Sequence, residues 1–182
     1  MKTALFLTLS FLSIANLNAQ EIYIPGKIAQ GEKVTYRCKD LKKLYLEVEN
    51  VNNTDTTRII YYEDGSIVPD YESERMPAKY IHSQEDLIRV FQEALTPEEW
   101  QKIKGKSGYG LFLRLVADSS GNTKELKFVF RSDDPVLTKF TPDRLFQLEE
   151  RFKEVIKLNW YKSAKRMRNV KYAQSIDYRE LE

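Results

Sequence analysis

The sequence predicts an α+β fold, an antiparallel sheet with helices packed on one face, preceded by a small β-rich N-terminal region. Residues 109–117 and 124–131 alternate apolar side chains with other types across a short polar turn, which is typical of a hairpin. The segment after Thr141 carries an apolar stripe at helical spacing. A helix with one apolar stripe over a sheet with one dry face is the simplest way to bury both surfaces.

Residues 1–19 have the pattern of a secretory signal peptide. Lys2 gives a short positive start, residues 4–14 are uncharged and mostly apolar, and Ala19 is a small residue suited to signal peptidase. The apolar stretch is too short to cross a bilayer, which takes roughly 20 residues. We therefore expect cleavage near Ala19 and a mature chain that begins at Gln20 or Glu21.

Composition and charge narrow the class of the mature chain. Its 163 residues carry a net charge of about +1, which gives no chain-wide case for nucleic-acid binding. The single cysteine, Cys38, excludes an intramolecular disulfide framework and lies too far from the signal to be a lipid-anchored residue. Charges interrupt every later apolar run, so no transmembrane segment is expected in the mature chain. These features favour a periplasmic or secreted bacterial protein.

Two regions with different predicted secondary structure follow the signal peptide. Residues 20–68 contain three runs that favour strands, 33–38, 44–51 and 58–62. Residues 69–80 are polar and proline-bracketed over most of their length, so a linker or long loop is expected there. Residues 81–182 would then form the main α+β domain.

Capping signals place the helices of this domain. Ser83 is a plausible N-cap for a first helix, and Thr96 with Glu99 makes a capping box for a second that ends at Gly105. Thr141, followed by proline, caps a third helix, in which Glu149 and the lysine four residues later are expected to pair on the solvent side. The stripe of this helix should place Phe152 beneath the hairpin.

The hairpin has two different faces. Three leucines at alternate positions occupy one face of its first strand, while Phe112, Arg114 and Val116 occupy the other. The turn over residues 118–122 contains a glycine that can adopt a positive φ. Residues 168–178 favour a final strand.

A set of short motifs runs through residues 84–181 in a fixed order. Two glycines precede a hydrophobic strand, an aspartate and a glycine occupy the hairpin turn, a serine follows the second strand, a leucine opens the long helix, and a tryptophan stands beyond its end. The residues are Gly108, Gly110, Asp118, Gly121, Ser132, Leu145, Trp160 and Ala164. This order resembles the carboxy-terminal domain of the TonB family, in which the last motif is W-x-x-P-A. Here Ser163 takes the place of the proline.

The departures from that family limit what the resemblance implies. TonB-like energy transducers keep an N-terminal membrane helix and a proline-rich spacer, whereas this N-terminus looks cleavable and the chain has six prolines. The resemblance thus implies a small module that binds a partner, by adding a strand at a sheet edge, rather than an energy transducer.

The sequence contains no recognisable catalytic constellation. His82 has no second histidine or cysteine near it in sequence, as zinc would need, and is expected to be an ordinary surface residue. A Cys38 nucleophile with His82 as its base would have to be assembled in space, and a small strand residue is the simpler interpretation of Cys38. We expect no catalytic residue, cofactor or metal ligand, and favour a binding protein over an enzyme. A small envelope hydrolase and a structural subunit of an envelope complex remain open alternatives.

A basic run over residues 162–171 holds five cations and no acid, with aromatic residues at both ends. Such a patch can bind nucleic acid, anionic lipid or an acidic glycan, or can be a solvated loop. A final strand often lies at a sheet edge with unpaired backbone groups, and the basic loop could steer an acidic partner towards it. We expect that partner to be another envelope protein, not nucleic acid. The predicted partner-binding residues are Trp160, Tyr161, Lys165, Arg166, Arg168 and Tyr172.

Overall fold

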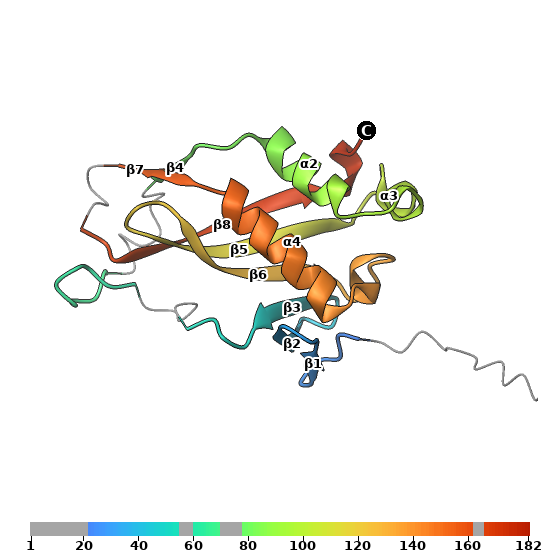
Figure 1. The fold of residues 1–182 in the computed structure, drawn as a ribbon, viewed down its shortest axis with the longest axis horizontal. Helices are drawn as coiled ribbons and strands as arrows, with labels where there is room; N and C mark the ends of the chain where they lie inside the picture. The colour runs from blue at the N-terminus through green and yellow to red at the C-terminus, as the bar shows by residue number, and fades with distance from the viewer. Residues whose placement is uncertain (1–21, 55–59, 70–77, 162–165) are drawn as a thin grey trace, which may run out of the picture.

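The computed structural model describes residues 22–54, 60–69, 78–161 and 166–182 and has the predicted α+β class (Figure 1). A six-stranded antiparallel sheet has the order β1-β2-β3-β6-β5-β8, and β4 pairs with β7 in a second, two-stranded sheet. The strands are β1 (Ile28–Gln30), β2 (Thr35–Leu41), β3 (Tyr45–Asn50), β4 (Ala78–Tyr80), β5 (Gly110–Asp118), β6 (Thr123–Arg131), β7 (Leu158–Trp160) and β8 (Asn169–Asp177). The helices are α2 (Gln84–Glu93), α3 (Pro97–Ile103) and α4 (Pro142–Val155), with short 3₁₀ turns η1 (Leu137–Lys139) and η3 (Tyr178–Glu180).

The helices start at the predicted caps. The Ser83 hydroxyl accepts a hydrogen bond from the backbone of Asp86, and the Asp86 carboxylate accepts one back from the Ser83 backbone. The same reciprocal pair joins Thr96 and Glu99 at the start of α3, while Thr141 caps α4. Each cap satisfies backbone donors that lack a partner within the helix, which fixes where each helix begins.

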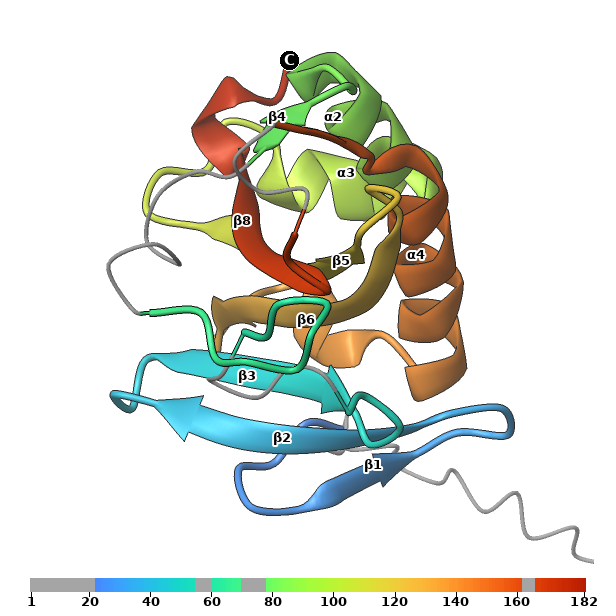
Figure 2. The ribbon, with the colours of Figure 1, turned by 90° about the vertical axis from the view of Figure 1, so that its left-hand side faces the viewer.

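One hydrophobic core lies between the sheet and the helices, which pack on the same side of it (Figure 2). Phe152 on α4 is fully buried in this core together with the inward leucines and phenylalanines of β5 and β6. The predicted position of Phe152 beneath the hairpin is confirmed. Leu87 and Phe91 bring α2 into the same core, so that burial of apolar area holds the helical layer to the sheet.

The β-rich N-terminal region joins the main sheet. β3 pairs with β6 over five residue pairs, from Tyr45↔Arg131 to Glu49↔Lys127. The β1–β2 turn is held to α4 because the Asp143 carboxylate accepts hydrogen bonds from two consecutive backbone N–H groups, at 2.8 Å each. A Cβ at Gly31 in this turn would lie 2.7 Å from Asp143 Oδ1, so a larger residue there would displace the Asp143 side chain.

The segments predicted between the two regions are only partly described. Of the strand expected over 58–62, the described residues Tyr61 and Tyr62 make isolated bridges. Most of the expected linker lies at 70–77, outside the described residues, and its last three residues form β4. Residues 1–19, the expected signal peptide, also lie outside the described residues. None of the helices among the described residues combines the length and the hydrophobicity that spanning a bilayer requires.

One prediction about α4 is wrong. Glu149 and Lys153 do pair, with Lys153 Nζ 2.5 Å from Glu149 Oε1, but Glu149 is fully buried instead of solvated. Its Oε2 accepts a hydrogen bond of 2.6 Å from the hydroxyl of Tyr36 on β2. Because β2 lies under α4, the side of the helix that looked polar in sequence faces protein.

The hairpin tip packs closely on β7. Gly121 has a φ of +82°, and a Cβ at this position would lie 2.0 Å from the Leu158 carbonyl oxygen. The Leu158 N–H donates to the Gly121 carbonyl at 2.9 Å. Only glycine combines this left-handed conformation with so close an approach of two backbones.

Candidate functional site

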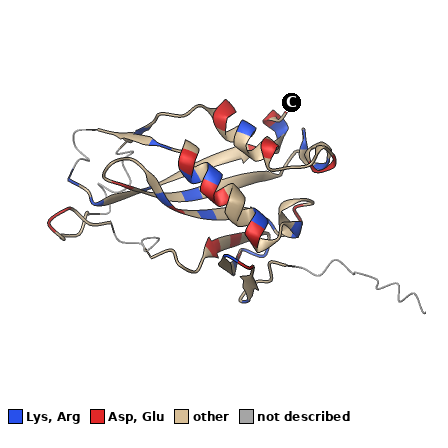
Figure 3. Cartoon of the chain, in the orientation of Figure 1, with Lys and Arg blue, Asp and Glu red and all other residues tan. Residues whose placement is uncertain are grey.

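The main sheet has a second face, which no described helix covers. On β5, Leu111, Leu113 and Leu115 point into the core, while Phe112 and Arg114 point the other way. We call this second surface the open face. It includes Arg37, Lys39, Leu41, Tyr45, Glu47, Glu49, Phe112, Arg114, Val116, Glu125, Lys127, Val129, Arg131, Lys171, Ala173 and Ser175. Figure 3 shows acidic residues on β3 and basic residues on the neighbouring strands.

Charged residues stand side by side across four strands of the open face. Arg37 on β2 is opposite Glu49 on β3, which is opposite Lys127 on β6, which is opposite Arg114 on β5. Cross-strand neighbours of this kind lie about 4.5–5.5 Å apart at Cβ, close enough to interact directly. The row ends at Ala173 on β8, whose small side chain leaves space above the sheet.

Glu49 is the centre of this row. Its carboxylate contacts Lys39 Nζ at 2.7 Å, Lys127 Nζ at 2.5 Å and Arg37 Nη1 at 3.1 Å. The Glu49 side chain is only 5% exposed. Burial alone would raise the pKa of Glu49, but hydrogen bonds from Lys127 and Lys39 prevail and hold it below its ordinary value. The carboxylate is therefore ionised and fully engaged.

Glu47, two residues earlier on β3, holds Arg114 and lies near two of the cations that contact Glu49. Arg114 Nη1 lies 2.6 Å from Glu47 Oε2, and the ammonium groups of Lys127 and Lys39 lie 3.8 Å and 3.9 Å from Oε1. Lysine and arginine side chains have many rotamers, and fixing them normally costs entropy. Here two buried carboxylates hold them in place before any ligand arrives.

A cavity of about 730 Å³ lies over this network. Its charged lining is Lys39, Glu47, Arg114, Lys127 and Lys171, and Leu41, Val116 and Ala173 add apolar surface. Lys171 makes no ion pair with a described carboxylate. Burial, and then repulsion from Lys127, lower the pKa of Lys171 below its ordinary value. The volume lies in the range of ligand-binding sites in proteins.

Two aromatic residues, Phe112 on β5 and Tyr45 on β3, lie on the open face near the cavity. Phe112 is 45% exposed, and its ring meets Tyr45 edge to face at a centroid distance of 6.3 Å. A second hollow of about 340 Å³ adjoins it, lined by Tyr109, Ser175 and Arg179 among others. Aromatic residues and arginine are residue types enriched in protein interfaces.

The residues predicted to bind a partner do not share one surface. Trp160 is half-buried between two small apolar clusters, while Tyr161, Arg166 and Arg168 are exposed. Tyr172 lines the open-face cavity, although its hydroxyl lies on the helix side of β8, 2.6 Å from Thr123 Oγ1. Lys165 lies outside the described residues. The described members thus belong to at least two environments.

The predicted edge position of β8 is confirmed, but the edge is partly occupied. The Tyr80 hydroxyl donates to the carbonyl of Ala173 at 2.7 Å, and Gln84 Nε2 donates to that of Ser175 at 2.8 Å. Two acceptors that an added strand would use therefore already have partners. This geometry argues against strand addition along the middle of β8.

Cys38 and His82 are far apart. Cys38 is buried in β2 facing the helices, where burial and then Asp40 raise its thiol pKa to about 11. His82 is partly buried, not the ordinary surface residue expected, and its ring lies 3.5 Å from Gln174 on β8. Three strands separate β2 from β8, a span of about 19 Å, so the two cannot form a dyad. No group of three or more candidate metal ligands occurs among the described residues.

Sequence reasoning missed most of the open-face cavity. The alternation of β5 did place Arg114 opposite the leucines, and Lys171 belongs to the basic run. The roles of Lys39, Glu47 and Lys127 depend on β3 lying beside β6. No local pattern in the sequence indicates that neighbour.

Comparison with known proteins supports the fold alone. No protein-family model and no curated protein matches the sequence. The crystal structure of a DUF5043 family protein from Bacteroides uniformis is similar, with a TM-score of 0.67 over 86% of this chain and 87% of that one. At 19% sequence identity the likeness extends to the α+β architecture and not to a function. The resemblance to the TonB family stays a prediction.

Proposed function

We propose that the mature chain is a secreted or periplasmic, non-enzymatic protein-binding module of a bacterial cell envelope, with the open face as its binding surface. The single observation that carries the proposal is the pre-arranged charge network beside the exposed ring of Phe112 on a sheet face that no described helix covers. The signal-like residues 1–19 support the envelope location, which mass spectrometry of the native N-terminus would test.

The composition of the open face suits protein recognition better than catalysis. Arginine and aromatic residues dominate the energetically important positions of protein interfaces, and Arg114 and Phe112 are adjacent on this face. Side chains held by Glu47 and Glu49 lose less freedom on binding, which favours affinity. Cys38 and His82 are too far apart to act together, so their positions do not support the hydrolase alternative.

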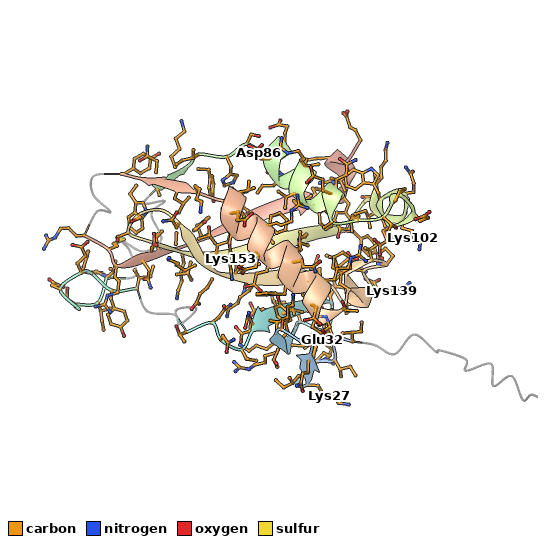
Figure 4. The ribbon with its side chains drawn as sticks, viewed as in Figure 1. Lys27, Glu32, Asp86, Lys102, Lys139 and Lys153 are labelled. Atoms are coloured by element: carbon orange, nitrogen blue, oxygen red, sulfur yellow. The ribbon has the colours of Figure 1, made fainter. Side chains whose placement is uncertain are left out.

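Site-specific crosslinking tests this function. A photoreactive residue at Ser175, an exposed open-face position, should capture a defined envelope protein in cells of the native host. The matched control is Lys102, exposed on α3 on the helix side (Figure 4). Capture of the same protein from position 102 and not from 175 would move the binding surface to the helical layer. The absence of any specific product at 175 would contradict the proposal.

A further inference from the structure

The part of the open face around the cavity and its ion pairs has more positive than negative charge. Five cations face three carboxylates, which leaves an excess of two positive charges. The cations are Arg37, Lys39, Arg114, Lys127 and Lys171, and the carboxylates are Glu47, Glu49 and Glu125. Glu125 accepts a hydrogen bond from the Thr54 backbone, so the two other carboxylates serve the cations around the cavity.

Donor groups on this face outnumber the acceptors that hold them. An ammonium has three N–H donors and a guanidinium has five. Arg114 contacts Glu47 through Nη1, and the closest contact of Lys127 is with Glu49. Both residues line the cavity, so donors that these contacts leave over are available to an acceptor that enters it.

Like charges also lie close together here. Arg114 and Lys127 are directly opposite each other on β5 and β6, an arrangement that is unfavourable for two cations. Lys171 experiences the charge of Lys127 and has no ion pair with a described carboxylate. An oxyanion placed among these three side chains would attract each of them and so offset their mutual repulsion.

The shape of the cavity favours an extended ligand over a compact one. Its lining runs from Leu41 on β2 to Ala173 on β8, across five adjacent strands. At about 4.8 Å per strand this is roughly 19 Å, the length of about six extended residues. Val116 and Ala173 add apolar surface beside Arg114 and Lys171, which suits a chain that alternates acidic and small side chains.

We infer that the open-face cavity is an oxyanion site, formed by Lys39, Arg114, Lys127 and Lys171, that receives carboxylates from an extended acidic segment of the partner protein. This inference rests on the proposed function and specifies the chemistry of the partner. Arg114 offers planar donors that match a carboxylate, while the lysines supply charge.

Peptide binding to the mature protein tests the inference. The probe is a capped octapeptide of alternating glutamate and alanine, measured by calorimetry at low salt, and the matched peptide has glutamine for glutamate. We expect the glutamate peptide to bind, binding to weaken as salt rises, and the glutamine peptide to bind at least about tenfold more weakly. Equal binding of the two peptides, or no binding of either, would overturn the inference.

Variants locate the site. Lys171→Gln should weaken binding of the glutamate peptide about tenfold without unfolding the protein, because Lys171 has no ion pair with a described carboxylate. Lys171→Arg should restore most of the affinity. Lys139→Gln removes the same charge from the exposed end of η1 and should leave affinity unchanged (Figure 4). Unchanged affinity in Lys171→Gln would place the peptide elsewhere.

Inorganic sulfate separates a peptide site from a site for small anions. Sulfate should compete weakly, and affinity for sulfate equal to that for the peptide would contradict a partner segment as the ligand. The outcomes also separate this inference from the proposed function. If crosslinking from Ser175 persists in Lys171→Gln, the proposal of a binding module stands and the inference of an acidic partner segment is wrong. If the glutamate peptide binds but no partner is crosslinked, the oxyanion site stands and the proposal of a protein-binding module is contradicted.

Discussion

The two faces of the sheet are built from the same strands but are stabilised in different ways. The face towards the helices is dry, and Leu113 and Phe128 stand opposite each other there without exposure. The neighbouring cross-strand pair, Arg114 and Lys127, belongs to a network of ion pairs beside a cavity. The alternation of a β-strand thus assigns stability to one face and leaves the other available for recognition.

The largest effect should come from the dry face. Phe152→Ala removes a fully buried ring beneath the hairpin and should lower the free energy of unfolding by about 3–5 kcal/mol. Urea unfolding followed by circular dichroism measures the loss. A loss below about 1 kcal/mol would mean that the core does not depend on α4 as the buried contacts indicate.

An intermediate effect, dependent on pH, should come from the charge network. The pKa of Glu49 is lower in the folded protein than in the unfolded chain, so the ionised group contributes stability above roughly pH 4.3. That contribution is lost as the pH falls through the lower folded pKa. Glu49→Gln should therefore destabilise the protein at pH 7 and lose less further stability than wild type between pH 5 and pH 3.

Urea midpoints at these three pH values test the prediction, with Lys139→Gln as a control for a change of charge elsewhere. Parallel loss of stability in wild type and Glu49→Gln on acidification would show that the network contributes nothing through this carboxylate.

The smallest effect should come from the exposed ring of the open face. Phe112→Ala removes a side chain that is 45% exposed, and the free energy of unfolding should fall by less than about 1 kcal/mol. If the open face binds a partner, the same variant should weaken that binding while leaving the urea midpoint almost unchanged. A loss of stability as large as that of Phe152→Ala would contradict the division between the faces.

Local interactions explain which features could be predicted from the sequence. A helix cap such as Thr96 with Glu99 acts within four residues, and the alternation of β5 acts within one strand, so both are visible in the sequence. The environment of Glu149 is different, because it depends on Tyr36 lying 113 residues away. The cavity depends likewise on β3 meeting β6. Where the partner is remote, polarity in the sequence does not distinguish solvent from a buried ion pair.

The pairing of β3 with β6 also sets the order in which the molecule can form. Glu49 and Lys127 are 78 residues apart, and β1, β2 and β3 are synthesised well before the hairpin that they join. Until β6 arrives, the strand that carries Glu47 and Glu49 has one edge without a partner, and pairing of such distant segments is slow. Native β3 must therefore wait for most of the chain, so a chain truncated before residue 123 should aggregate or remain unfolded.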